Sequence, residues 1–193
     1  MTTRTPFNLV HLTQSTLKKK LLAYFFTNPE SKLYLREIAN LINVDPTNLS
    51  RDLRRFEAEG IFTSQKRGNQ KYFSLNRNYP LFDELKSTIF KTIGVRGTLE
   101  SLFKKLSGVK RAFIYGSFAK NSEQASSDID LCLIIQKGEF KEEPFLKEIH
   151  ALEKQLGREI SYVFFTGEEW KRKEAEKDSF VSGILTSKRL ELI

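Results

Sequence analysis

The chain has 193 residues and is 39% hydrophobic, which fits one large globular domain or two small ones and excludes a disordered chain. No apolar run reaches the roughly 18 residues of a membrane span, and no signal peptide is recognisable, so we expect a cytoplasmic protein without a membrane partner. The single cysteine cannot form an intrachain disulfide, and the sequence has no His/Cys zinc pattern.

The net charge of +8 is concentrated in the front half of the chain. Residues 1–93 contain 15 Lys/Arg against 8 Asp/Glu, whereas residues 94–193 contain 17 against 16. A basic front half beside a nearly neutral back half indicates that nucleic acid would bind the front half.

Three helices are predicted in the front half. The first covers residues 15–26, and the second covers residues 35–42, whose apolar positions follow the i, i+3, i+4, i+7 pattern of one buried face. The third is predicted over residues 46–59, because Asp45 can cap its start and Gly60 suits the position after its end.

The third helix has one apolar face and one basic face. The basic face carries three arginines and three small polar residues, namely Thr47, Asn48, Ser50, Arg51, Arg54 and Arg55. Such side chains can contact guanine edges, other base edges or phosphates in a major groove.

A hairpin is predicted next, with strands over 61–64 and 71–75. Its basic tip, residues 65–70, includes Lys66 and Arg67, which could contact phosphates.

The run YLREIANLINVDPTNLSRDLRRFEAEGIFTSQKRGNQKYFSL resembles the winged-helix regulators of the ArsR/MarR type, and this resemblance covers residues 15–76. It implies that double-stranded DNA is a partner and that the protein forms a homodimer on paired half-sites. Two alternatives remain: a helical domain with a solvated charged face, and a winged helix that binds protein.

An amphipathic helix is predicted after Tyr79-Pro80, with Phe82, Leu85, Ile89 and Ile93 on one face and Gly94 at its end. This segment could pack on its own domain, link two domains or pair with its copy in a dimer. A shorter helix is predicted around Leu99, Leu102, Phe103 and Leu106.

The back half carries the pattern that indicates chemistry. A strand over residues 109–115 runs into Gly116-Ser117, and after ten intervening residues Asp128 and Asp130 open a second strand. Residues i and i+2 of a strand share a face, so the two carboxylates would converge and could hold Mg²⁺. Gly116 lets the backbone approach a ligand, and Ser117 offers a hydroxyl at a helix start, which suits a triphosphate.

The stretch YGSFAKNSEQASSDIDLCLII resembles the nucleotidyltransferase superfamily typified by DNA polymerase beta, and the resemblance covers residues 98–193. It implies a mixed sheet with flanking helices. It also implies that NTP and Mg²⁺ are bound, with the triphosphate at Gly116 and Ser117 and the metals at Asp128 and Asp130, the catalytic carboxylates.

The same resemblance implies a third carboxylate on a later strand, which we place at residues 158–165. The matching position is Ser161, and a serine cannot replace a carboxylate as base or strong metal ligand. Glu159, two residues earlier on the same face, is the alternative carboxylate. The departure favours a domain that binds nucleotide as a sensor over one that is catalytic.

Together these patterns predict an α+β protein of two domains: a winged helix-turn-helix over residues 1–79, a linker helix over 80–97 and a nucleotidyltransferase-like domain over 98–193. The favoured function is a DNA-binding transcriptional regulator whose second domain binds NTP-Mg²⁺. The alternative is an active enzyme that transfers NMP to a hydroxyl of a protein, nucleic acid or small molecule. By resemblance, a toxin–antitoxin context would suit that enzyme.

Overall fold

The computed structural model describes residues 15–193. The N-terminal segment in which no signal peptide is recognisable lies outside the described residues. The chain divides into two compact units, Met1–Val95 with Lys154–Gly157, and Arg96–Glu153 with Arg158–Ile193. Within residues 15–193, no helix is long and apolar enough to cross a membrane.

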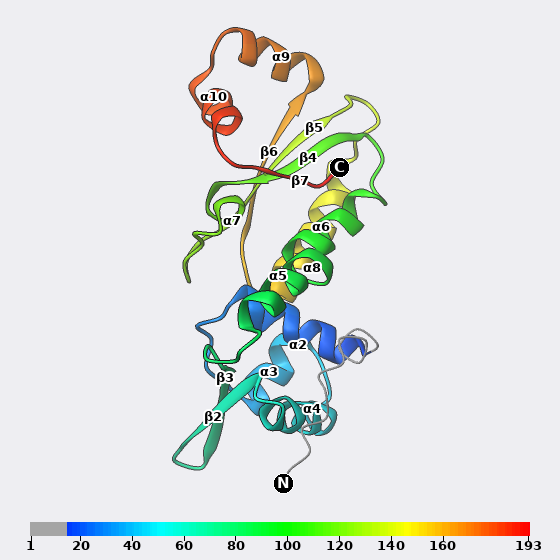
Figure 1. Ribbon diagram of the computed structural model, residues 1–193. Coiled ribbons are helices and arrows are strands. Elements are labelled where there is room, and N and C mark those ends of the chain that lie inside the picture. The colour runs from blue at the N-terminus through cyan, green and yellow to red at the C-terminus, as the bar shows by residue number, and fades with distance from the viewer. Residues whose placement is uncertain (1–14) are drawn as a thin grey trace. The chain divides into compact units, whose positions relative to one another are not determined.

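The first unit combines helices with a small antiparallel sheet (Figure 1). Its elements are α2 (Thr16–Thr27), β1 (Leu33–Tyr34), α3 (Leu35–Ile42), α4 (Pro46–Ala58), β2 (Phe62–Arg67), β3 (Gln70–Leu75) and α5 (Phe82–Thr92). The strand order is β1-β3-β2. The three helices predicted from apolar periodicity and capping signals are present to within one residue at each end. Strand β1 was not predicted, because two residues are too few to show an alternation.

The apolar face of α4 packs into the core of this unit. Leu49, Leu53 and Phe56 are all buried, at the i, i+4, i+7 spacing of one helix face. The ring of Phe62 on β2 stacks against Phe56 and meets Phe25 of α2 edge-on. These contacts fix which side of α4 points inward, and they leave its basic side in solvent.

The hairpin differs from the prediction at its tip. Strand β2 continues through Lys66 to Arg67, which pairs with Gln70, so only Gly68 and Asn69 form the turn. Gly68 has φ +56, a conformation that two-residue hairpin turns favour and that glycine adopts without strain. The six-residue tip was wrong because polar side chains do not exclude a strand whose faces are both in solvent.

The second unit is built on a mixed sheet with the order β6-β5-β4-β7. Its elements are α6 (Val95–Phe103), β4 (Val109–Tyr115), α7 (Gly116–Lys120), β5 (Ile129–Ile135), α8 (Glu142–Leu156), β6 (Ile160–Thr166), α9 (Gly167–Ala175), α10 (Ser179–Thr186) and β7 (Leu190–Glu191). The first residue of α6 and the last three of α8 fall in the first unit. β4 pairs antiparallel with β5 and β7, whereas β5 and β6 are parallel, with α8 in the connection between them.

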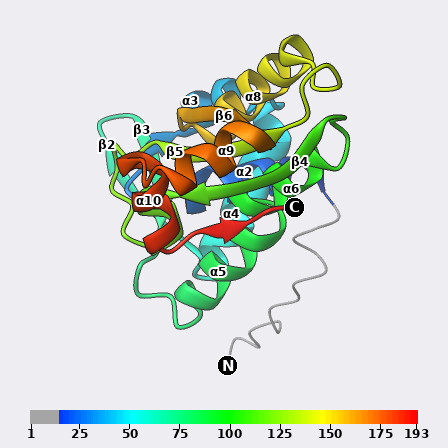
Figure 2. The same cartoon turned by 90° about the horizontal axis from the view of Figure 1, so that it is seen from above.

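The two faces of this sheet are covered by different helices, as the alternation along β6 shows. Tyr162 and Phe164 pack on Phe145 of α8. Val163 and Phe165 point to the other face and pack in the cluster that α9 and α10 contribute to. Figure 2 shows α9 and α10 together on one side of the sheet.

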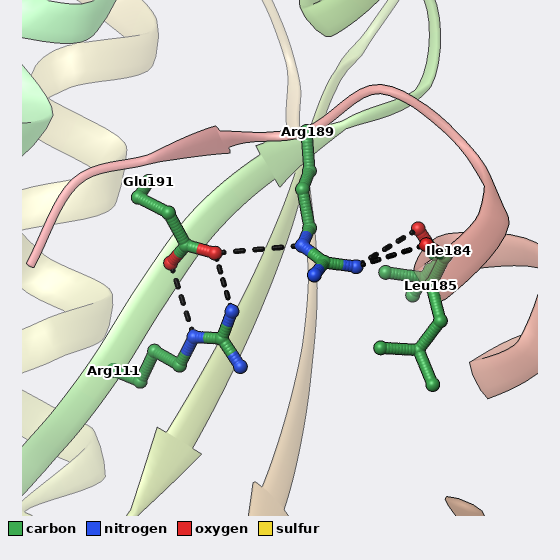
Figure 3. A network of polar contacts seen from close by, with 5 residues as sticks. All are labelled: Arg111, Ile184, Leu185, Arg189 and Glu191. Atoms are coloured by element: carbon green, nitrogen blue, oxygen red, sulfur yellow. Dashed lines mark hydrogen bonds and ion pairs between the residues drawn. The ribbon is translucent and has the colours of Figure 1, made fainter.

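Strand β7 is tied to the sheet by a network of polar contacts (Figure 3). The carboxylate of Glu191 accepts hydrogen bonds from two nitrogens of Arg111, one of them Nε at 3.0 Å. Arg189 lies 3.4 Å from the same carboxylate and donates to the carbonyls of Ile184 and Leu185 at the end of α10. The network therefore joins β4, β7 and the C-terminal end of α10.

The capping of helix α4 by Asp45 can be tested by mutation. The Asp45 carboxylate accepts hydrogen bonds from the backbone N–H groups of Thr47 at 2.9 Å and Asn48 at 3.1 Å. Asp45→Ala should lower the free energy of unfolding by about 1 kcal/mol, because two helix N–H groups lose their acceptor. Asp45→Asn, which keeps an acceptor, should stay close to wild type. Urea unfolding of the full chain followed by circular dichroism measures both; equal stability of the alanine variant and wild type would contradict the capping role.

Candidate functional site

Tyr115, Asp130 and Ser161 form one row across the sheet of the second unit. The antiparallel register sets Tyr115 opposite Asp130, and the parallel register sets Asp130 beside Ser161. Residues paired across neighbouring strands project from the same face of a sheet. Cys132, the next residue of β5 on that face, packs in the cluster with α9 and α10. The row therefore lies at one end of the face that these helices cover.

The chain turns sharply at Gly116, directly against Asp130. Gly116 has φ +69, and a Cβ built on it would lie 2.0 Å from Oδ2 of Asp130. Only glycine satisfies both the left-handed conformation and this close approach. Ser117 follows in the first turn of α7, so the structure brings the predicted Gly-Ser step and Asp130 together.

Asp128 and Asp130 lie at the start of β5. We predicted both on the strand, but β5 begins at Ile129, the first residue that pairs with β6, and Asp128 precedes it and is exposed. Asp130 is half-buried. Burial raises the pKa of Asp130, and the negative charge of Asp128 raises it further, so the two carboxylates lie within each other's field.

The donor set formed by these side chains is small. Within residues 15–193, no group of three or more His, Cys, Asp or Glu side chains is arranged to hold a metal ion. Two carboxylates nevertheless suit Mg²⁺, which commonly takes one or two carboxylates together with substrate phosphates. The residues present thus fit a metal that arrives with a nucleotide.

Arg158 organises the segment between α7 and Asp128, a role that the sequence did not reveal. It is buried, and its Nη1 donates to the carbonyls of Gln124 at 3.0 Å, Ala125, and Ser127 at 3.0 Å. Its guanidinium lies 5.8 Å from the centre of the Phe118 ring. An arginine before a strand usually faces solvent, so only the fold shows that this one holds the segment that leads to Asp128.

Ser161 puts a hydroxyl, not a carboxylate, next to Asp130. Glu159, the alternative carboxylate, is exposed and precedes β6, and its backbone carbonyl accepts a hydrogen bond from Ile129 N–H at 2.9 Å. The register thus sets Ser161, and not Glu159, beside Asp130.

The remaining polar groups of this face are kept neutral. Burial raises the pKa of the Cys132 thiol to about 12, so this side chain is not a thiolate nucleophile. The pKa of Tyr115 is also raised to about 12, first by burial and then by the negative charge of Asp130. Tyr115 thus remains protonated beside the carboxylates.

The predicted DNA-binding residues lie on two elements of the first unit. Helix α4 carries Thr47, Asn48, Ser50, Arg51, Arg54 and Arg55, and β2 carries Lys66 and Arg67. All are exposed except Ser50, which is half-buried. Arg55 pairs with Glu59 at 2.8 Å, whereas Nε of Arg54 donates to the carbonyl of Ser50 at 3.3 Å.

A groove of about 530 Å³ lies between α4, the start of α3 and the hairpin. Its lining combines apolar Leu35 and Phe73 with polar and cationic residues, among them Tyr34 of β1, Arg36, Arg54, Asn69, Gln70 and Lys71. Nζ of Lys71 lies 2.7 Å from the carboxylate of Glu57, which also accepts a hydrogen bond from Ser64, so α4 and the hairpin are tied together. The sequence did not single out Arg36 or Lys71, because only tertiary packing brings them beside Arg54.

Comparison with known proteins bears on the second unit. Residues 95–182 match the family model described as "Nucleotidyltransferase domain". This part of the chain is therefore similar to nucleotidyltransferase domains. Both the row at Asp130 and the turn at Gly116 lie within it.

A curated protein of Methanocaldococcus jannaschii, named "Putative protein adenylyltransferase", is 39% identical over 59 residues. The match spans 30% of this chain and 61% of that relative's length. Of the two functions that the sequence suggested, these comparisons support the nucleotidyltransferase more than the regulator.

The contact at Gly116 yields a prediction. In Gly116→Ala, the left-handed backbone alone costs about 1–2 kcal/mol, and the added methyl must displace the Asp130 carboxylate. We expect lower stability in chemical unfolding. Gly183→Ala is the matched control, because this glycine has open space around it within α10 and should be neutral or slightly stabilising. Equal stability of Gly116→Ala and wild type would contradict the close approach.

Proposed function

We propose that the nucleotidyltransferase domain binds a nucleoside triphosphate with Mg²⁺ and transfers its NMP group to a hydroxyl group. The observation that carries this proposal is the contact of Gly116 with the Asp130 carboxylate. It sets the Gly116-Ser117 step and the acidic pair Asp128 and Asp130 side by side, as a nucleotide with its metal requires.

Each of these residues has a role in the proposed reaction. The turn at Gly116 and the Ser117 hydroxyl would bind and orient the triphosphate, and Asp128 and Asp130 would hold the metal. Mg²⁺ bound there would neutralise charge on the phosphates. The acceptor oxygen bonds to the α-phosphorus, the α–β phosphoanhydride bond breaks, pyrophosphate leaves with the electron pair, and the acceptor proton is released.

Among the described residues, the proposed site lacks an obvious group to accept the proton of the acceptor hydroxyl. In the row across the sheet, Ser161 lies where a carboxylate would accept that proton, and a serine hydroxyl cannot do so near neutral pH. We therefore infer that proton removal limits the rate of transfer, while nucleotide binding is retained.

The name of the Methanocaldococcus jannaschii relative suggests the two substrates. An adenylyltransferase that acts on protein uses an AMP donor and a protein side chain as acceptor. We propose ATP as donor and a protein hydroxyl as acceptor.

A labelling experiment tests the transfer. The full chain is incubated with Mg²⁺ and a total protein extract, in parallel with ATP labelled at the α- or the γ-phosphate. We expect protein labelling from α-labelled ATP only, because the γ-phosphate leaves in pyrophosphate. Asp130→Asn should abolish it. If α-labelled ATP leaves no protein label, or if the label survives Asp130→Asn, the proposal is wrong.

Restoring the missing carboxylate gives a second test. Ser161→Asp should raise kcat at least about 10-fold, because a positioned general base contributes about 10²–10⁴-fold. Ser161→Ala, which adds no carboxylate, should match wild type, and Glu159→Gln tests the alternative carboxylate. A Ser161→Asp variant no faster than wild type, or a loss of activity in Glu159→Gln, would contradict this account of the base.

A separate observation favours a second function for the first unit. The solvent-facing side of α4 presents Arg51 and Arg54, and Arg54 shares a groove with the hairpin. We propose that this unit is a winged helix-turn-helix that binds double-stranded DNA, with α4 in the major groove and Lys66 and Arg67 near phosphates. A homodimer on paired half-sites and a role in transcriptional regulation extend the same proposal.

The DNA proposal is tested with the DNA upstream of the protein's own coding region. Arg51→Ala and Arg54→Ala should each weaken binding, and each lost phosphate contact should reduce the salt slope by about 1. Lys91→Ala removes the same charge from an exposed position on α5 and serves as the control. Fluorescence anisotropy at several salt concentrations measures both quantities. The proposal fails if the two arginine variants bind as Lys91→Ala does.

A further inference from the structure

Phe180, in the first turn of α10, is an exposed aromatic side chain with 42% of its surface accessible. The other phenylalanines within residues 15–193 are buried or half-buried. A single exposed apolar residue is ordinary on a protein surface. Phe180, however, lies beside the proposed nucleotide site, and this position suggests that the ring contacts the ligand.

The ring of Phe180 lies over β5, on the face that carries Asp130. It meets the ring of Tyr115 on β4 edge-on, with centroids 5.8 Å apart, and the ring of Phe165 on β6 at 6.3 Å. Strands β4 and β6 flank β5, so a ring that touches both lies above β5. Tyr115 is also the register partner of Asp130, which places this aromatic pair next to the row of Tyr115, Asp130 and Ser161.

The first turn of α10 is held in place. The Asp178 carboxylate accepts hydrogen bonds from the backbone N–H groups of Phe180 and Val181, both at 3.1 Å, and pairs with Lys173 at 2.9 Å. The rings below Phe180 are fixed as well, since Phe165 packs on buried Trp170. A rigid, partly exposed aromatic surface binds a flat ligand at little entropic cost.

We propose that the ring of Phe180, supported edge-on by Tyr115, forms a stacking surface for the base of the bound nucleotide, and that the site consequently prefers purine nucleoside triphosphates. This inference rests on the proposed binding of NTP at Gly116, Asp128 and Asp130. The triphosphate is held at the row, and the base, separated from it by the ribose, reaches the neighbouring aromatic pair. Stacking on an aromatic ring needs no hydrogen bond to the base, and its strength increases with the area of the base.

The test is calorimetric titration of the full chain in Mg²⁺ with ATP, GTP, CTP, UTP and inorganic tripolyphosphate. Wild type should bind ATP and GTP more tightly than CTP and UTP. Phe180→Ala should weaken ATP binding about 5- to 150-fold, the range for loss of base–aromatic stacking, and leave tripolyphosphate binding unchanged. Phe180→Tyr, which keeps the ring, should bind like wild type. Fluorescence of the single tryptophan, Trp170, reports that the cluster below remains folded.

The other outcomes separate this inference from the proposed function. Unchanged ATP affinity in Phe180→Ala overturns the stacking surface but not nucleotide binding, and if transfer to protein is then lost, the surface belongs to the acceptor. Equal losses for ATP and tripolyphosphate would mean that Phe180 acts on the phosphate site, which also overturns the inference. If wild type binds neither ligand, the proposed function fails, and this inference fails with it.

Discussion

The contact between Gly116 and the carboxylate of Asp130 is the constraint on which the second unit depends. Because Tyr115 pairs with Asp130, the chain leaving β4 must turn against that carboxylate, and only a glycine at φ +69 allows the turn. Helix α7 starts at this point, and Arg158 holds the segment that returns the chain to β5. A strand ladder, one left-handed residue and one buried cation thus create a place where a triphosphate and two carboxylates can meet.

The row of Tyr115, Asp130 and Ser161 suits the binding of a metal and nucleotide better than it suits catalysis. Its central carboxylate is half-buried beside a second acid, which favours a bound cation, but the neighbouring strand contributes the Ser161 hydroxyl where a proton acceptor would be needed. The basic face of α4 belongs to the first unit. It lies in solvent because Leu49 and Phe56, on the opposite side of the helix, are buried in the core of that unit. Nucleotide chemistry and DNA binding are therefore independent proposals.

Much of this arrangement could be predicted from local patterns. Periodicity and capping located the helices at residues 35–42 and 46–59, and the Gly-Ser and Asp-x-Asp spacing indicated residues that the fold brings together, because these signals lie within one element or one turn. Strands β1 and β7 have two residues each and carry no such signal. Arg158, the groove beside Arg54 and the position of Phe180 depend on contacts between distant segments, so no local pattern could reveal them.

The central claim is that Gly116, Ser117, Asp128 and Asp130 form one site for NTP with Mg²⁺. Calorimetric titration of the full chain with ATP and Mg²⁺, beside the Asp128→Ala/Asp130→Ala double variant, tests it most directly. The structure predicts binding by wild type that requires Mg²⁺ and is lost in the double variant. Binding of equal strength by both proteins, or by neither, would contradict the claim and leave the acidic pair as a purely structural feature.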